Sequence, residues 1–294
     1  KFHMTKFLDI TVIIPCYQAQ NTLIGTLNCI PKELSIICVD EGSTDNTSEI
    51  LKKWKKDSTI NRKIINHKKN LGLGASRNSG ISLVESKWVI FLDADDLITR
   101  DWYHELKNSW KVIEASQGWC WNPYLEWDSK TNVKRDRRTD SISNHEDLIT
   151  KRHPFSASGG LFRKDILEKV EGFDTNRDLE GTEDLDLYMK LYRIGIRPLQ
   201  WSKTPHTLYR TNYGMTNNLK LHGAKLFLRI KEFHEKGWIS TNSLKAANQE
   251  IWRQIARTEH KRGEFKNALK SYKKGKLTLS SIFLRLMAKS RIKI

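Results

Sequence analysis

The chain has 294 residues, 38% of them hydrophobic and 29% charged, which suits one large α/β domain or one domain with an appendage. No apolar run approaches the length of a membrane-spanning helix, so the sequence argues against an integral membrane protein. The four cysteines show no CxxC spacing and no nearby histidine cluster, which argues against a zinc site and against disulfide bonds.

The formal net charge of +17 is unevenly distributed. Residues 217–294 contain 19 Lys and Arg against five Asp and Glu, a net charge of +14, whereas residues 1–216 carry only +3. The sequence therefore indicates a nearly neutral domain followed by a basic extension. We expect the natural chain to begin at Met4 without a secretory signal peptide, and we expect it to be cytoplasmic.

Short apolar strands alternate with helices through the first 115 residues. Strands are expected at residues 9–17, 35–39, 63–65 and 88–92, and helices at 22–30, around 50–54, at 75–84 and at 100–115. This alternation predicts an α/β fold with a mostly parallel sheet and helices on both faces. In such a sheet the loops that follow the strands meet along one edge, where ligands bind.

The strand Trp88–Leu92 runs directly into three carboxylates. Side chains alternate along an extended chain, so Asp93 and Asp95 point the same way and repel each other unless a cation lies between them. Mg²⁺ or Mn²⁺, which prefer oxygen ligands, would fit there. The alternative is that Asp95 or Asp96 caps the next helix and that Asp93 lies in a turn.

A second group of carboxylates begins a later helix. Thr182 is expected as its N-cap, and Glu183, Asp184 and Asp186 follow in the first turn. The helix dipole stabilises carboxylates at this position, but capping explains one of them and not three. From residue 217 onward the pattern is helical throughout, over residues 219–234, 243–261, 265–274 and 280–288.

Five segments agree in order and spacing with one known family of enzymes. They are Ile14–Gln18, Val39–Asp45, Asn70–Asn78, Asp93–Asp95 and Gly181–Leu187. Together they resemble the inverting nucleotide-sugar glycosyltransferases of the GT-A fold, known as glycosyltransferase family 2. The resemblance covers roughly residues 9–216 and leaves out the basic extension.

The resemblance implies a Rossmann-like GT-A catalytic domain over residues 5–216, with a nucleotide-sugar half at 5–98 and an acceptor half at 99–216. A basic α-helical C-terminal region would then occupy residues 217–294. The implied activity is metal-dependent and uses Mn²⁺ or Mg²⁺. A sugar would move, with inversion, from a nucleotide sugar, preferably a UDP-sugar, to a glycan or lipid-linked glycan in polysaccharide biosynthesis.

The resemblance also implies roles for single residues. The donor would be bound by Pro15, Tyr17 and Asp40 at the nucleobase, Asn70 on the ribose side, Arg77 and Arg210 at the diphosphate, and Asp93 at the ribose or sugar. Asp95, with Asp93 beside it, would hold the metal. Asp184 would be the general base that takes the acceptor proton, and Glu183 would bind the acceptor or orient the base. Asp186 remains open between a cap or surface charge and a role in the site, and Tyr17 could be an ordinary aromatic at a strand end.

The chain departs from the family pattern at two positions. Glu41 stands where the family usually has a second Asp, which makes Glu41 a poor candidate for a nucleotide contact. Asn212 stands where the family often has a His, so a histidine contact to the metal or the diphosphate is in doubt. His206 could substitute for it, although a solvent-facing loop histidine is the favoured interpretation.

Acceptor recognition is predicted from aromatic and small residues. Trp119 and Trp121, with Trp127 nearby, could form a platform for a sugar, but alternating tryptophans in a strand are more often part of a core. Ser158 and Gly159 would leave room beside the site.

Two other functions compete with the transferase. One is a sugar-nucleotide-binding or scaffolding module without turnover, and the other is a nucleic-acid binder that uses the basic extension. No motif for base readout is present, so no nucleic acid is expected. We favour contact of the amphipathic stretch Ser280–Lys289 with an anionic membrane, as a peripheral protein at the inner face of the cell membrane. In the alternative, these helices pack on the catalytic domain or form a homodimer.

Overall fold

The computed structural model describes residues 8–56, 61–136, 139–211, 218–275 and 279–294. The chain forms two compact units. Unit 1 comprises Lys1–Arg138 and Pro154–Tyr213, and unit 2 comprises Thr139–His153 and Gly214–Ile294. The segment Thr139–His153, which the sequence analysis assigned to the acceptor half, is thus grouped with the C-terminal helices.

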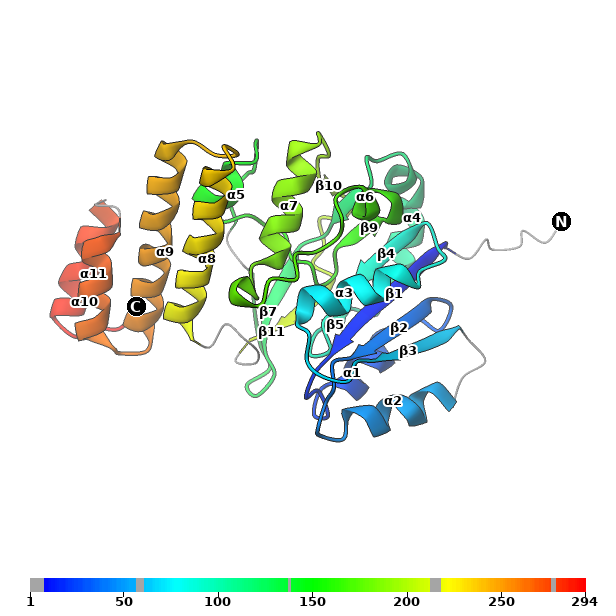
Figure 1. Ribbon diagram of the computed structural model, residues 1–294. Helices are drawn as coiled ribbons and strands as arrows, with labels where there is room; N and C mark the ends of the chain where they lie inside the picture. The colour runs from blue at the N-terminus through cyan, green and yellow to red at the C-terminus, as the bar shows by residue number, and fades with distance from the viewer. Residues whose placement is uncertain (1–7, 57–60, 137–138, 212–217, 276–278) are drawn as a thin grey trace. The chain divides into compact units, whose positions relative to one another are not determined.

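Unit 1 is built on a seven-stranded sheet with the order β10-β6-β9-β4-β1-β2-β3 (Figure 1). Its strands are β1 (Ile10–Cys16), β2 (Ser35–Asp40), β3 (Arg62–Asn66), β4 (Trp88–Phe91), β6 (Trp119–Trp121), β9 (Leu161–Arg163) and β10 (Leu199–Gln200). All neighbours pair in parallel except β9, which runs antiparallel to both β4 and β6. The prediction of a mostly parallel sheet is confirmed.

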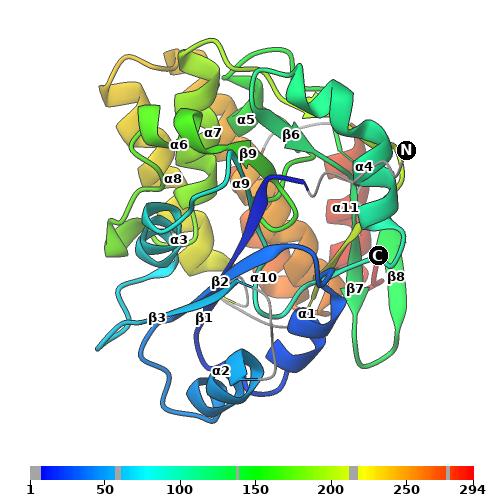
Figure 2. The ribbon, with the colours of Figure 1, turned by 90° about the vertical axis from the view of Figure 1, so that its right-hand side faces the viewer.

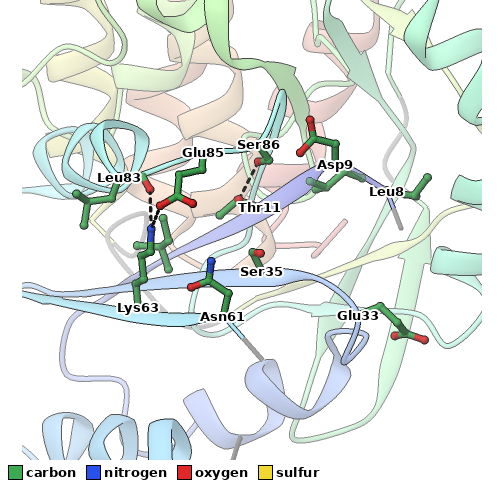
Figure 3. Close-up of a pocket in the computed structure, with 12 residues that line it drawn as sticks. Leu8, Asp9, Thr11, Glu33, Ser35, Asn61, Lys63, Leu83, Glu85 and Ser86 are labelled. Carbon is green, nitrogen blue, oxygen red and sulfur yellow. Dashed lines mark hydrogen bonds and ion pairs between the residues drawn. The ribbon is translucent and has the colours of Figure 1, made fainter. Parts of the chain in front are cut away.

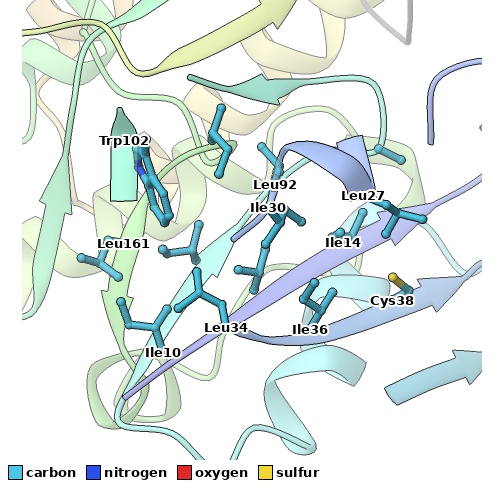
Figure 4. Close-up of a cluster of buried hydrophobic side chains, with 14 of the residues drawn as sticks. Ile10, Ile14, Leu27, Ile30, Leu34, Ile36, Cys38, Leu92, Trp102 and Leu161 are labelled. Atoms are coloured by element: carbon cyan, nitrogen blue, oxygen red, sulfur yellow. The ribbon is translucent and has the colours of Figure 1, made fainter. Parts of the chain in front are cut away.

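Helices cover both faces of this sheet, as predicted. One face carries α1 (Leu23–Cys29), α2 (Thr47–Lys56) and α4 (Trp102–Glu114). Alternate residues of β1, namely Ile10, Val12 and Ile14, point into a core shared with these helices (Figure 4). The strands are apolar on both sides because both faces are buried.

The opposite face carries α3 (Leu73–Ser82) and α7 (Glu183–Arg193). A Cβ placed on Gly80 of α3 would lie 2.5 Å from Ile13, so the helix can approach β1 this closely only with glycine there. Figure 2 shows α2 and α3 on opposite sides of β2 and β3. Between α3 and α7 the chain also forms α6 (Lys164–Lys169) and the short 3₁₀ helix η1 (Arg177–Leu179).

Unit 1 also contains a second, four-stranded sheet, whose first strand follows the carboxylate loop. Its order is β5 (Leu97–Ile98), β11 (Thr207–Arg210), β7 (Tyr124–Asp128) and β8 (Val133–Asp136). The aromatic stretch that the sequence predicted as one strand is therefore divided between β6 in the first sheet and β7 in the second. The small sheet places Arg210 close to the end of β4, since β11 pairs with β5.

Unit 2 is helical, as the sequence predicts. It contains α5 (Asp147–Thr150), α8 (Leu219–Glu235), α9 (Thr241–Lys261), α10 (Phe265–Lys274) and α11 (Leu279–Lys289). A small core of Ala256, Ala268, Tyr272 and Ala288 joins α9, α10 and α11. Among the described residues, no helix is both long and apolar enough to cross a membrane.

Candidate active site

The three carboxylates after β4 form a tight loop rather than a helix start. The Asp93 N–H donates to Ser158 Oγ (3.1 Å), and the Asp96 N–H donates to the Asp93 carbonyl (3.0 Å). Asp96 is 1% exposed, and its Oδ1 accepts the Arg210 N–H at 2.8 Å. The interpretation of Asp96 as a helix cap is wrong, because the chain continues into β5 and α4 begins only at Trp102.

The electrostatics of this loop favour a bound cation. Burial, and then the charge of Asp93, raise the pKa of Asp95 to about 6. Burial and the charges of Asp93 and Asp95 hold the pKa of Asp96 well above its ordinary value. Asp96 Oδ2 also has no hydrogen-bond partner in the described part of the chain. Arg77 pairs with one oxygen of Asp93, but no ion pair to Asp95 or Asp96 occurs among the described residues, so a hard divalent cation would suit the charge of these two carboxylates.

The described residues contain no group of three His, Cys, Asp or Glu side chains that would form a complete metal site. Mg²⁺ commonly takes only one or two carboxylates from a protein and its other ligands from substrate phosphates and water. Asp93 and Asp95 are the residues that would hold it.

Arg77 lies between the two acidic groups that the sequence analysis singled out. Its Nη2 donates to Asp93 Oδ1 (2.8 Å) and its Nη1 to Glu183 Oε1 (3.2 Å). The side chain is 2% exposed, and burial, which would lower the pKa of the guanidinium, is outweighed by the charges of Asp93 and Glu183, so that the pKa is raised. Both terminal nitrogens of Arg77 thus bond to carboxylates away from solvent, and its contact with the diphosphate stays a prediction.

The start of α7 brings three carboxylates together. Glu183 is buried, its Oε2 accepts the Gly181 N–H (2.7 Å), and burial raises its pKa to about 7 despite the charge of Arg77. Asp184 is half-buried and its Oδ1 accepts the Leu185 N–H at 2.7 Å.

Asp186 is buried and pairs with Lys190 (2.7 Å), which supports the structural role for this residue. The Thr182 hydroxyl donates to the Leu179 carbonyl (2.6 Å) rather than accepting an N–H of the helix.

The loops after β1 and β2 contain the residues that are predicted to bind the nucleobase. Tyr17 follows Pro15 and Cys16 and is 48% exposed. Asp40 is buried, and its carboxylate accepts the Ser43 N–H (3.0 Å) and the Ser48 hydroxyl. A carboxylate has room for a further donor beyond these two.

Gln18 is a residue of this region that the sequence analysis did not assign. Its Oε1 accepts the N–H groups of Thr44 and Asp45, both at 3.1 Å, and its Nε2 donates to Thr44 Oγ1 (2.9 Å). Gln18 thereby ties the loop after β1 to the loop after β2. No spacing rule identifies such a link, because its partners are 26 and 27 residues away.

The glycine-rich turn before α3 is fixed by side chains. Asn70 Oδ1 accepts the Gly72 N–H (2.9 Å), and Glu180 Oε1 accepts the Leu73 N–H (3.3 Å) at the start of α3. Gly72 has φ +100°, and a Cβ there would lie 2.4 Å from Arg177 Nη1. Asn70 therefore shapes the turn in this structure.

The small sheet brings Arg210 to the carboxylate loop, and its contact with the diphosphate stays a prediction. Arg210 Nε donates to the Asp95 carbonyl (2.7 Å), and its guanidinium lies 4.4 Å from the centre of the Trp127 ring. The preceding residue, Tyr209, packs against Tyr124 with ring centres 5.8 Å apart. Burial and the charges of Asp96 and Asp93 raise the pKa of Tyr209, which places this unpredicted tyrosine near the acidic loop.

The predicted acceptor residues are two aromatic residues, Trp119 and Trp121, and two small residues, Ser158 and Gly159. Trp119 is 1% exposed and stacks on Tyr188 with ring centres 5.0 Å apart, so it belongs to the core and the sugar-platform interpretation is wrong for it. Trp121 is half-buried and packs edge-on against Phe155. Ser158 holds the Asp93 backbone, and Gly159 (φ +83°) lies so close to Thr207 that a Cβ would meet its Oγ1 at 2.1 Å.

His206 is neither a solvent-facing residue nor a free ligand. It is 1% exposed and stacks on Trp201 with ring centres 5.5 Å apart. Its Nε2 bonds to Glu105 Oε2 (2.6 Å) and its Nδ1 to Thr99 Oγ1 (2.8 Å). Both ring nitrogens are thus occupied, which argues against His206 as a replacement for the histidine missing at residue 212.

A hollow of about 270 Å³ lies elsewhere in unit 1 (Figure 3). Its lining includes Asp9, Thr11, Ser35 and Lys63, which come from the amino-terminal ends of β1, β2 and β3. The carboxylates follow the carboxyl-terminal end of β4, so this hollow is a feature separate from the candidate active site.

Comparison with known proteins identifies the family of the chain. The model of "Glycosyl transferase family 2" matches residues 11–171. The chain is 35% identical over 224 residues to glycosyltransferase GlyA of Streptococcus pneumoniae, covering 70% of this chain and 31% of that protein. It is 27% identical over 216 residues to the poly-beta-1,6-N-acetyl-D-glucosamine synthase of Staphylococcus epidermidis, covering 68% and 51%. The chain thus spans about a third to a half of these relatives.

Solved structures share the fold. Staphylococcus aureus TarS 1–349 in complex with UDP-GlcNAc has a TM-score of 0.60 and 18% identity, covering 96% of this chain and 87% of that one. The mannosyltransferase PcManGT from Pyrobaculum calidifontis in complex with GDP-Man and Mn²⁺ has a TM-score of 0.60 and 16% identity, covering 97% and 81%. With the GT-A fold, the carboxylate loop and the matching family model, the chain belongs to glycosyltransferase family 2.

Proposed function

We propose that the chain transfers a sugar, with inversion, from a UDP-sugar to a glycan or lipid-linked glycan, with Mn²⁺ or Mg²⁺ bound at Asp93 and Asp95. The observation that carries this proposal is the acidic loop Asp93–Asp96 at the carboxyl end of β4, in which Asp96 is buried and Asp93 and Asp95 are half-buried. Two proteins of the same fold, TarS in complex with UDP-GlcNAc and PcManGT in complex with GDP-Man and Mn²⁺, support a nucleotide-sugar donor and a metal.

In this proposal the nucleotide sugar lies across the carboxyl ends of β1, β2 and β4. The nucleobase stacks on Tyr17, and Asp40 accepts one of its N–H groups in addition to the loop bonds that it already makes. The guanidinium of Arg210, beside Asp95, attracts the diphosphate. Asp93 and Asp95 would hold the metal, which would supply positive charge to stabilise the diphosphate as a leaving group.

Asp184 is the general base in this mechanism. Its Oδ1 accepts the Leu185 N–H, and we assign Oδ2 to take the proton from the acceptor hydroxyl as that oxygen attacks opposite the diphosphate. Glu183 lies one residue away and is held by Arg77 and Gly181, so its role is to orient this first turn.

The test of this function is sugar transfer by Asp184→Asn. A general base contributes about 10²–10⁴-fold to a rate, so the variant should lose transfer by this factor and still bind UDP. Asp178→Asn, at an exposed carboxylate six residues earlier, is the matched control and should transfer normally. Normal transfer by Asp184→Asn would disprove the assignment of the base.

We also propose that unit 2 binds an anionic membrane surface through α11. Ile282, Phe283 and Leu286 are 41%, 62% and 58% exposed, and Leu286 lies one turn after the other two, whereas Ala288 is buried against α10. Residues 265–294 contain nine Lys and Arg and no Asp or Glu. An apolar face within a purely basic segment is the pattern of a helix that lies at an anionic lipid surface.

Vesicle flotation with the full chain tests this surface. Phe283→Ser combined with Leu286→Ser should abolish binding to vesicles that contain anionic lipid, while Val112→Ser, at an exposed apolar residue of α4, should leave it unchanged. Equal binding of all three proteins, or equal binding to neutral and anionic vesicles, would remove the proposal. Self-association that Phe283→Ser and Leu286→Ser abolish would instead favour a homodimer.

A further inference from the structure

Arg77 in α3 contacts both acidic parts of the candidate active site. Its two terminal nitrogens reach Asp93 at 2.8 Å and Glu183 at 3.2 Å, and these partners lie 16 and 106 residues away in the chain. Arg77 is 2% exposed and Glu183 is almost as buried, so water does not weaken the contact between them. A single guanidinium therefore connects the loop after β4 with the first residue of α7.

The neighbours of Arg77 leave it little freedom. Its guanidinium lies 5.0 Å from the centre of the Phe173 ring and 6.0 Å from that of Phe91. At one end, Glu183 is also bonded to the Gly181 N–H through its second oxygen. At the other end, the backbone of Asp93 is bonded to Ser158. Each partner is thus held by a further contact, and the link between them is rigid.

We propose that Arg77 is a positioning residue that fixes the first turn of α7, and with it Asp184, relative to Asp93 at the donor. This inference rests on the proposed function, because it concerns the distance between the donor and the base. It differs from a direct contact with the diphosphate, which the burial of Arg77 disfavours. A displacement of a base by about 1 Å can lower a rate by about a hundredfold, so such a link has a measurable effect.

The chemistry of arginine suits this role and that of lysine does not. A guanidinium is planar and presents separate N–H groups in fixed directions, so it can bond two carboxylates at once. The ammonium group of lysine keeps the charge but carries its donors on one atom. Arg77→Lys should therefore keep the buried charge balanced and lose the simultaneous contact with Asp93 and Glu183.

The test separates turnover from nucleotide binding. For Arg77→Lys we expect kcat at saturating donor to fall at least tenfold, while the Kd for UDP in the presence of Mn²⁺ changes less than threefold. Arg163→Lys is the matched control, since Arg163 makes a forked contact with Asp165 outside the site, and it should leave both quantities unchanged. An unchanged kcat, or a Kd for UDP raised tenfold or more, would overturn the inference.

Glu183→Gln tests the same link from its other end and keeps the shape of the side chain, which guards against a failure of Arg77→Lys to fold. It should also lower kcat with little change in the Kd for UDP. The double variant should be no slower than the slower single variant, because both changes break one connection. Multiplicative losses, or a normal kcat for Glu183→Gln, would overturn the inference. Absence of transfer by the unaltered chain would instead count against the proposed function.

Discussion

Exposure decides which of the aromatic residues in the candidate active site can contact a ligand. Tyr17 and Trp119 both stand at the ends or edges of strands, yet Tyr17 is 48% exposed and Trp119 is 1% exposed. The sequence offered both interpretations for each residue, since alternation along a strand does not reveal what covers it. Tyr188, which covers Trp119, lies 69 residues further along the chain.

Tyr17 gives a prediction for donor binding. Tyr17→Ala should raise the KM for the donor about tenfold, because stacking of a base on an aromatic ring contributes roughly 1–3 kcal/mol. Tyr17→Phe keeps the ring and should bind the donor normally. Steady-state kinetics over a range of donor concentrations measures both, and a normal KM for Tyr17→Ala would rule out the stacking.

The carboxylates show what a motif can and cannot predict. The spacing of Asp93 and Asp95 after a buried strand was sufficient to predict an acidic loop at the sheet edge, and the structure has it. The contacts of Arg77 and His206 were not predictable, because each depends on a partner more than a hundred residues away. Long-range pairs of this kind follow from the packing of whole elements rather than from local pattern.

At the scale of single elements, α3 packs at very short distance against the segment that contains Asp174. A Cβ on Gly74 would lie 2.1 Å from the Asp174 carbonyl, well inside contact distance. The first turn of α3 therefore needs glycine for close packing, and Arg77 follows one turn later.

Gly74→Ala should consequently destabilise unit 1. Overpacking of a closely packed site costs about 1–3 kcal/mol, and we expect the melting temperature to fall accordingly. Gly25→Ala is the matched control, because a Cβ on Gly25 of α1 would meet Leu97 at an ordinary 3.7 Å. It should be neutral or slightly stabilising, since alanine is favoured over glycine within a helix. Equal melting temperatures for the two variants would contradict the close contact of α3.

The link between α4 and the small sheet should depend on pH. The Ser202 hydroxyl donates to Glu105 (2.6 Å) and, with His206, lowers the pKa of that carboxyl below its usual value. A carboxyl with a lowered pKa binds its proton more weakly in the folded chain than in the unfolded one. Its stabilisation is therefore fully present above about pH 4.3, the ordinary pKa of Glu, and is lost as the pH falls through the lowered pKa.

Glu105→Gln should accordingly lower the melting temperature by roughly 1–3 °C at pH 7, with a smaller difference at pH 3. Glu114→Gln, at an exposed residue of the same helix, should have no effect at either pH. A difference for Glu105→Gln that grows toward pH 3 would show that the sign of this interaction is opposite.

At the scale of the whole molecule, the order of strands and helices was largely predictable. The alternation of apolar strands and amphipathic helices predicted the parallel sheet, and the helical spacing of apolar residues predicted the four long helices of unit 2. The antiparallel strand β9 and the second sheet were not predicted, because their strands have only two to five residues and their pairing joins distant segments. The grouping of Thr139–His153 with unit 2 likewise depends on contacts of α5 with α9.

The two units of the chain differ in their charge. The acidic loop belongs to unit 1, whereas most of the net positive charge belongs to unit 2. Catalysis and any contact with an anionic surface are therefore expected to be separable by point substitution: Phe283→Ser with Leu286→Ser should leave transfer to a soluble acceptor unchanged. A loss of such transfer, measured as release of free UDP, would contradict this separation.

The central claim is a nucleotide sugar bound together with a divalent metal at Asp93 and Asp95. Melting temperatures measured with UDP-sugars, with and without Mn²⁺, test it most directly, because a ligand at a hundred times its Kd stabilises the native state by about 2.7 kcal/mol. We predict that at least one UDP-sugar raises the melting temperature only when Mn²⁺ or Mg²⁺ is present, and that Asp95→Asn abolishes this rise. An equal rise in Asp95→Asn, or no rise with any nucleotide sugar and either metal, would contradict the claim.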